Sequence, residues 1–158
     1  MNRFSATTES TAVVPADRME IWRALTDADL LPRLTPLLNS IDTNGDHWTW
    51  HMIKIGALGV SITPVFTEKM TFDEGVRIDY NHDAPAGVKE TAGAEGSYRL
   101  ADVQGGTKLD ISLTVTIELP LPRGAGPAVR AIMQKTMDRT GAKFSANLLK
   151  YLGVPAAA

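Results

Sequence analysis

The chain contains no cysteine, and this absence excludes several kinds of chemistry at once. Without thiols there are no disulfides, no thiolate nucleophile and no cysteine-ligated zinc. Histidine is also scarce: His47, His51 and His82 are the complete set, and no H-E-x-x-H motif or metal-ligand spacing joins them. We therefore expect neither a metal ion nor a cofactor.

An excess of charge of one sign and long hydrophobic runs are lacking as well. The 16 basic residues are scattered and the formal net charge is -2, so no field attracts a phosphate backbone, and we expect no nucleic-acid partner. No stretch approaches the roughly 18 apolar residues that cross a bilayer. The first residues lack the apolar core of a signal peptide. We expect a cytoplasmic protein without a transmembrane segment, with peripheral membrane or protein contact left open.

What is present is a pair of helical patterns, at residues 14–34 and 126–152, separated by strand patterns. A threonine-rich strand over residues 3–14 suits a sheet edge and ends at Pro15. Asp17 and Glu20 form a capping-box-like helix start. Asp27 can cap a second short helix, which Pro32 is expected to end.

The middle of the chain has the turn signals of antiparallel strands. Asn44-Gly45-Asp46 predicts a hairpin between strands at 38–42 and 47–55, and Gly56 with Gly59 marks a bend or a further turn. Alternate residues from Leu109 to Leu119 are apolar, which is typical of a half-buried last strand.

The closing helix carries an apolar stripe at three- and four-residue steps, and Gly153 and Pro155 are expected to end it. The order of elements suggests a curved sheet wrapped around this helix with a space between them, which implies a ligand. The periods of the strands and of the closing helix predict which residues face that space, and their side chains are large, adaptable or polar. The predicted ligand-binding set is Trp48, Trp50, Met52, Phe66, Met70, Tyr80, Leu113, Met133, Thr136, Met137, Thr140 and Phe144.

Three ionisable residues continue the apolar faces of the strands and are the candidates for catalysis: Glu68, Tyr80 and His82. In an apolar cavity, desolvation raises the pKa of a carboxyl group and lowers that of an imidazole, so such a pair can act as acid and base. The alternative is structural. In that interpretation His82 lies past the end of its strand in solvent, and Glu68 forms an ion pair at the rim.

Several motifs together resemble the START-like, or SRPBCC, superfamily of polyketide cyclase and lipid transport proteins. They are Pro15-Ala16, Trp22-x-x-Leu25-x-Asp27, Pro32, Gly106-Thr107-x-Leu109 and the amphipathic closing helix. The resemblance covers nearly the whole chain. It implies an α+β helix-grip fold, in which a seven-stranded curved antiparallel sheet surrounds a long C-terminal helix and two short helices follow the first strand. It also implies a single START-like ligand-binding domain over residues 1–153, with a short tail at 154–158.

Three functions are compatible with these observations. The first is binding or transport of a small hydrophobic ligand, such as a lipid, a quinone or a polyketide-like molecule, in an internal cavity. The second is a polyketide cyclase or dehydratase that uses an inward acid or base among Glu68, Tyr80 and His82. The third is an accessory protein that binds a partner or a membrane through the loop at 120–127 and the closing helix.

Overall fold

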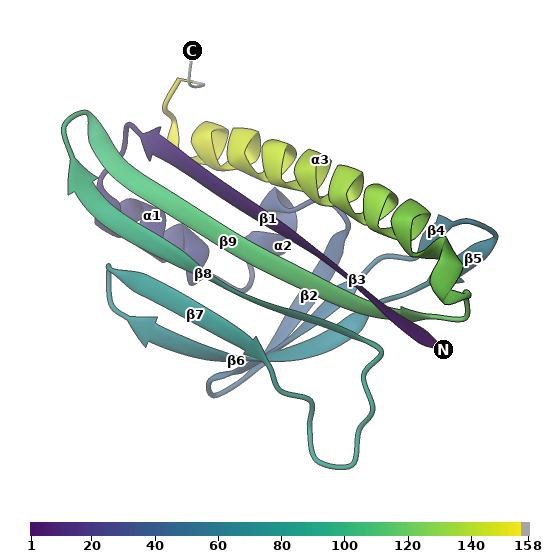
Figure 1. The fold of residues 1–158 in the computed structure, drawn as a ribbon. Helices are drawn as coiled ribbons and strands as arrows, with labels where there is room; N and C mark the ends of the chain where they lie inside the picture. The colour runs from purple at the N-terminus through teal and green to yellow at the C-terminus, as the bar shows by residue number, and fades with distance from the viewer. Residues whose placement is uncertain (156–158) are drawn as a thin grey trace.

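The computed structural model describes residues 1–155, and it consists of one large curved sheet, a small hairpin and a long helix (Figure 1). The strands are β1 (Asn2–Val14), β2 (Leu38–Asn44), β3 (His47–Met52), β4 (Ile55–Ala57), β5 (Val60–Ile62), β6 (Val65–Asp73), β7 (Arg77–His82), β8 (Ala92–Val103) and β9 (Gly106–Leu119). The helices are α1 (Arg18–Leu25), α2 (Leu31–Leu34), the 3₁₀ turn η1 (Arg123–Ala125) and α3 (Gly126–Leu152). Of the predicted tail 154–158, residues 156–158 lie outside the described part.

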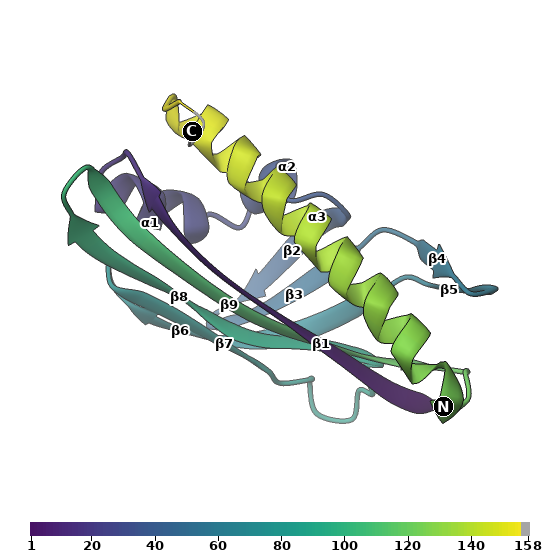
Figure 2. The same ribbon diagram turned by 45° about the horizontal axis from the view of Figure 1, so that its top comes forward.

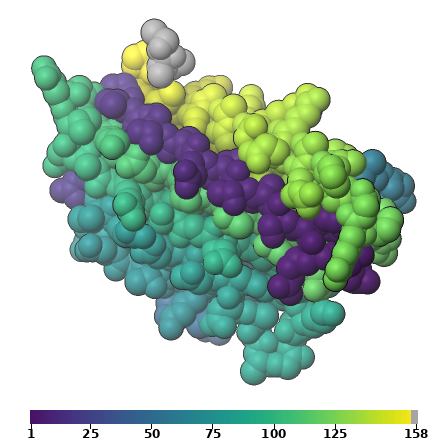
Figure 3. Space-filling view, in the orientation of Figure 1, coloured from purple at the N-terminus to yellow at the C-terminus, as the bar shows by residue number. Residues whose placement is uncertain are grey.

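The sheet has seven antiparallel strands in the order β1-β9-β8-β7-β6-β3-β2, so β1 is at an edge as predicted. Helix α3 crosses the concave side, and the sheet curves beneath it (Figure 2). Figure 3 shows β1 and α3 in contact along one face of the molecule, with the loop between β7 and β8 projecting below. This is the helix-grip α+β fold, which confirms the predicted fold class.

The first helix begins as the sequence predicts, whereas the expectations for the second helix need correction. Asp17 caps α1 by accepting a hydrogen bond from the Met19 backbone N–H at 3.1 Å. Asp27 instead caps a turn, accepting from the backbone N–H groups of Asp29 and Leu30. The prediction that Pro32 ends the second helix was wrong: Pro32 lies in the first turn of α2, where its missing N–H leaves no helical hydrogen bond unmade.

A second correction concerns the predicted strand at 47–55. Strand β3 ends at Met52, and Ile55 begins a separate hairpin in which β4 pairs with β5. Leu58 and Gly59, both at positive φ, form the turn of that hairpin, close to the bend or further turn predicted at Gly56 and Gly59. At the other end of the chain, Gly153 adopts the left-handed conformation that ends α3, as predicted.

Helix α3 contacts two separate buried clusters, one near each of its ends. Near its start, Val129 and Met133 belong to a cluster with Phe4, Ala6 and Leu119. Near its end, Phe144 and Leu148 join the larger cluster formed by α1, α2 and strands of the sheet. Between these ends the facing side chains are only partly buried.

We predict that Ile78→Ala lowers the free energy of unfolding by about 2 to 5 kcal/mol, because Ile78 is fully buried in the larger cluster and truncation leaves a cavity there. Urea unfolding followed by circular dichroism measures this. The matched control is Ile53→Ala, at a side chain that is 44% exposed, which should change stability by less than about 0.5 kcal/mol. Equal unfolding midpoints for the two variants would contradict this core assignment.

Candidate functional site

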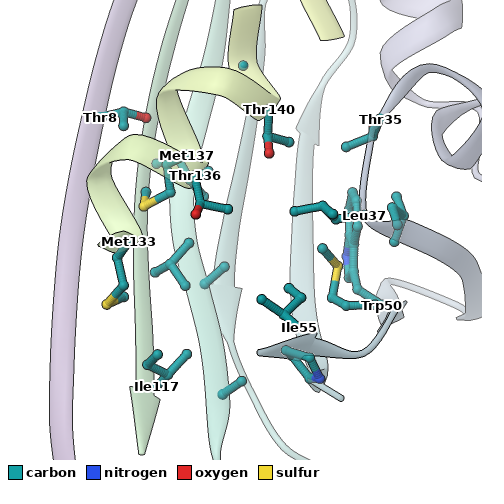
Figure 4. A pocket seen from close by; sticks show the side chains of 18 of the residues that line it. Thr8, Thr35, Leu37, Trp50, Ile55, Ile117, Met133, Thr136, Met137 and Thr140 are labelled. Atoms are coloured by element: carbon teal, nitrogen blue, oxygen red, sulfur yellow. The ribbon is translucent and has the colours of Figure 1, made fainter. Parts of the chain in front are cut away.

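A cavity of about 520 Å³ lies between the concave face of the sheet and α3. Its walls come from all strands of the large sheet, from the β4–β5 hairpin and from α1, α2 and α3. Figure 4 shows Met133, Met137 and Thr140 of α3 facing Trp50 and Ile55 across this space. Its volume falls within the range of roughly 300 to 1,000 Å³ that is usual for small-molecule sites.

The walls are apolar along most of their length, and every residue of the predicted ligand-binding set lines the cavity. These are Trp48, Trp50, Met52, Phe66, Met70, Tyr80, Leu113, Met133, Thr136, Met137, Thr140 and Phe144. The period-two pattern of the strands and the three- and four-residue steps of the helix place them there. That they hold a ligand stays a prediction.

Glu68 carries a carboxyl group that the fold buries in the cavity wall. It lies on β6 opposite Trp48 of β3, and 3% of its surface is exposed. Its Oε2 atom has no hydrogen-bond partner within residues 1–155. Burial raises the pKa of its carboxyl group to about 8, so the neutral acid predominates at neutral pH. The interpretation that Glu68 forms an ion pair at the rim was therefore wrong.

Tyr80 also lines the cavity, but its hydroxyl hydrogen is engaged. The hydroxyl donates to the backbone carbonyl of Ser112 at 2.9 Å. Gly96 lies beside this hydrogen bond, and a Cβ atom at that position would collide with both groups. Burial raises the pKa of Tyr80 well above its usual value, with further contributions from Tyr98 and Glu68. Both observations favour Tyr80 as a packing and positioning residue over a proton donor.

His82, the third catalytic candidate, does not line the cavity. It ends β7 opposite Glu68 in the register, but its Nε2 lies 2.9 Å from Glu90 Oε1, and Glu90 also accepts hydrogen bonds from Thr67. Thr67 alternates with Glu68 along β6, so this cluster belongs to the outer side of the sheet. The inward placement predicted for His82 was wrong because period two fails where the strand ends.

The other two histidines pair with carboxylates at exposed positions. His47 Nε2 lies 2.8 Å from Asp83, and the hydrogen bond to Asp83 is the main cause that raises the pKa of His47. His51 Nε2 lies 2.8 Å from Asp42. Across residues 1–155, no cluster of three or more His, Asp or Glu side chains is arranged to hold a metal ion.

Several wall residues were not anticipated from the sequence. Tyr98 of β8 lies 5.7 Å from Tyr80 between ring centroids, and the alternation of Gly96, Tyr98 and Leu100 was the signal for its inward side chain. Leu37 and Ile55 complete the wall beside Trp50 (Figure 4). Their place depends on the β4–β5 hairpin and on a positive φ at Leu37, which no local pattern indicates.

A curved antiparallel sheet closed over a cavity by one long helix defines a helix-grip, START-like domain. Residues 5–148 match the family described as "Polyketide cyclase / dehydrase and lipid transport", and the chain belongs to that family. The resemblance inferred from the motifs is thereby confirmed. Within the described residues, no helix has the length and hydropathy needed to cross a membrane.

Solved structures share the fold at low sequence identity. A protein of Thermus thermophilus is 17% identical with a TM-score of 0.68, covering 94% of this chain and 96% of its own. The Zhui aromatase/cyclase from a Streptomyces species is 13% identical with a TM-score of 0.65, covering 94% of each chain. A START superfamily protein from Mycobacterium smegmatis is 17% identical with a TM-score of 0.63, covering 93% and 97%. No curated protein sequence matches the chain.

We predict that the buried carboxyl makes stability fall with rising pH. The pKa of Glu68 is about 8 in the folded chain and ordinarily 4.5, so the unfolded chain releases this proton first. The contribution of Glu68 to stability is therefore fully present below about pH 4.5 and is lost as pH rises to about 8. At roughly 1.4 kcal/mol for each pKa unit, the loss is on the order of several kcal/mol.

Urea unfolding at a series of pH values tests this expectation. Glu68→Gln should remove most of the decline in unfolding free energy between about pH 5 and pH 9. The matched control Glu95→Gln, at an exposed position of β8, should keep the decline of the unmodified chain. A Glu68→Gln protein with the same pH dependence as the unmodified chain would show that Glu68 is solvated or paired in solution.

Proposed function

We propose that residues 1–153 form a single domain that binds a small hydrophobic ligand, such as a lipid, a quinone or a polyketide-like molecule. One observation carries the proposal: a cavity of about 520 Å³ is kept between the sheet and α3. Protein interiors are normally close-packed, and a void lined by apolar side chains forgoes dispersion contacts. A ligand that fills the cavity restores those contacts.

The composition of the wall supports an apolar and variable ligand. Met52, Met70, Met133 and Met137 supply flexible, polarizable surface that adapts to different shapes. The stacked rings of Trp50 and Phe66, with an interplanar angle of 8°, add a flat surface. The family description includes lipid transport, which is compatible with this ligand class.

We predict that filling the cavity abolishes uptake of an apolar dye. Met137→Trp places a larger ring in the middle of the α3 wall, so the affinity for Nile red, an uncharged dye, should fall at least about tenfold. Fluorescence titration measures the affinity, and urea unfolding should show a change below about 3 kcal/mol. The matched control Arg139→Trp, on the exposed side of α3, should bind the dye normally. Equal binding by both variants would place the dye outside this cavity.

A second candidate function is favoured by the buried carboxyl. A neutral Glu68 in an apolar cavity can act as a general acid, and the pKa of about 8 suits proton transfer near neutral pH. The family description includes polyketide cyclases and dehydrases, and the Zhui protein is an aromatase/cyclase. In this alternative the cavity folds a polyketide-like substrate so that Glu68 protonates an oxygen as water leaves.

We predict that a turnover assay on polyketide-like substrates separates the two functions. Glu68→Gln preserves shape but cannot release a proton, so it should cut turnover by about 10² if the chain is an enzyme. Nile red affinity should then change by only a few-fold. Turnover by the unmodified chain that survives in Glu68→Gln and in the control Glu95→Gln alike would remove Glu68 from the chemistry.

A further inference from the structure

Two buried polar atoms in the cavity wall have no hydrogen-bond partner within residues 1–155: Trp50 Nε1 and Glu68 Oε2. A third such atom, Glu118 Oε2, lies 3.8 Å from the ammonium group of Lys89 and does not line the cavity. Buried polar atoms in native proteins are nearly always partnered, so each exception calls for a physical explanation. In a cavity, either a water molecule or a ligand atom can supply the missing partner, and a ligand that displaces the water must replace its hydrogen bonds.

The two atoms belong to neighbouring positions of the same wall. In the β3–β6 register Trp50 lies opposite Phe66, and Glu68 is two residues further along β6 on the same face. Such diagonal neighbours are about 7 to 8 Å apart and within reach of long side chains. One polar group of a ligand can therefore contact both side chains while its apolar part lies against the methionines of the wall.

The charges of the wall limit what that group can be. Among the described residues, the charged side chains that line the cavity are Glu9, Glu68 and Asp138, all acidic, and the first and last are exposed. No lysine, arginine or histidine of residues 1–155 lines it. An anionic head group would lose its hydration and meet no countercharge in the wall, so fatty carboxylates are disfavoured ligands.

The hydrogen-bonding character of the two side chains narrows the choice further. An indole N–H is a donor only, and a protonated carboxyl group also presents an O–H donor. Burial keeps the Glu68 carboxyl largely in that protonated form at neutral pH. Two donors at neighbouring positions of one apolar wall match an oxygen acceptor on the ligand.

We propose that the cavity selects uncharged ligands that carry a carbonyl oxygen, which accepts hydrogen bonds from Trp50 Nε1–H and from the carboxyl group of Glu68. This selectivity rests on the proposed ligand-binding function and adds the chemical class of the bound group. Trp50 and Glu68 are then the residues that determine specificity, and the apolar wall supplies the remaining affinity.

Glu68 is the ionisable group whose protonation controls this selectivity, because the neighbouring groups either stay protonated or lie outside the cavity. Tyr80 of β7 and Tyr98 of β8 lie closest, and burial raises the pKa of both hydroxyls, so they stay protonated. His82, opposite Glu68 on β7, is held by Glu90 outside the cavity. Glu9 of β1 and Asp138 of α3 are exposed at the cavity wall. Ionisation of Glu68 as pH rises through about 8 therefore removes a donor and repels a carbonyl oxygen.

Four naphthalene probes of similar size test the proposal by isothermal titration calorimetry: acetylnaphthalene, ethylnaphthalene, naphthoate and naphthylmethylamine. Two net hydrogen bonds should make the ketone bind about five- to tenfold more tightly than the hydrocarbon at about pH 6, and naphthoate should bind most weakly. The preference for the ketone should shrink as pH rises through about 8.

Variants assign the preference to the two side chains. Glu68→Leu and Trp50→Phe should each reduce the preference for the ketone about threefold or more, since each removes one donor. Glu68→Gln keeps an N–H donor, so it should retain the preference and lose its pH dependence. Glu95→Gln, exposed on β8, should behave as the unmodified chain does.

The possible failures are distinguishable. Nile red uptake without a preference for the ketone would overturn this proposal and leave the ligand-binding function standing. Tightest binding of naphthylmethylamine, increasing above about pH 8, would overturn it in favour of a cation that pairs with ionised Glu68. No uptake of Nile red by the unmodified chain would overturn the ligand-binding function and this proposal together.

Discussion

The attachment of α3 at its two ends is the constraint on which the rest of the structure depends. Val129 and Met133 pack against Phe4, Ala6 and Leu119, and Phe144 with Leu148 packs into the larger cluster. Met133 and Phe144 are separated by about 16 Å along the helix at 1.5 Å for each residue. Because the sheet curves away over this interval, the helix spans the cavity while its ends remain fully packed (Figure 2).

This arrangement keeps part of the core away from the cavity. Ile21 and Ile78 are fully buried in the cluster at the far end of α3 and do not line the cavity, whereas Leu25 and Phe144 belong to that cluster and also form part of the cavity wall. Thr136, Met137 and Thr140 are only partly buried at the middle of the helix. A chain that derives its stability from the helix ends can keep a costly uncharged carboxyl and an unfilled hydrogen-bond donor at the centre.

The direction of side chains could be predicted from the sequence where an apolar pattern repeats along a single strand or helix. The alternation from Leu109 to Leu119 and the stripe on 126–152 placed whole faces correctly, because a pleat or a helical turn fixes side-chain direction. Prediction failed where direction depends on other elements. His82 lies at the end of β7, where Glu90, in the loop that connects β7 to β8, binds its ring. The burial of Glu68 without a hydrogen-bond partner for its Oε2 atom within residues 1–155 likewise depends on the elements packed around it.

The positions of the acidic and basic groups limit the chemistry that the cavity can support. The sheet separates them: Glu68 faces the cavity, whereas His82, with Glu90 and Thr67, lies on the outer side. Tyr80 donates its hydrogen to a backbone carbonyl. Among the described residues, no histidine or lysine side chain lines the cavity to serve as a base beside the acid, and the other carboxylates at the wall, Glu9 and Asp138, are exposed. The wall is therefore suited to donating a hydrogen bond or a single proton to a bound oxygen, and a reaction that needs a paired acid and base would require the substrate to supply the second group.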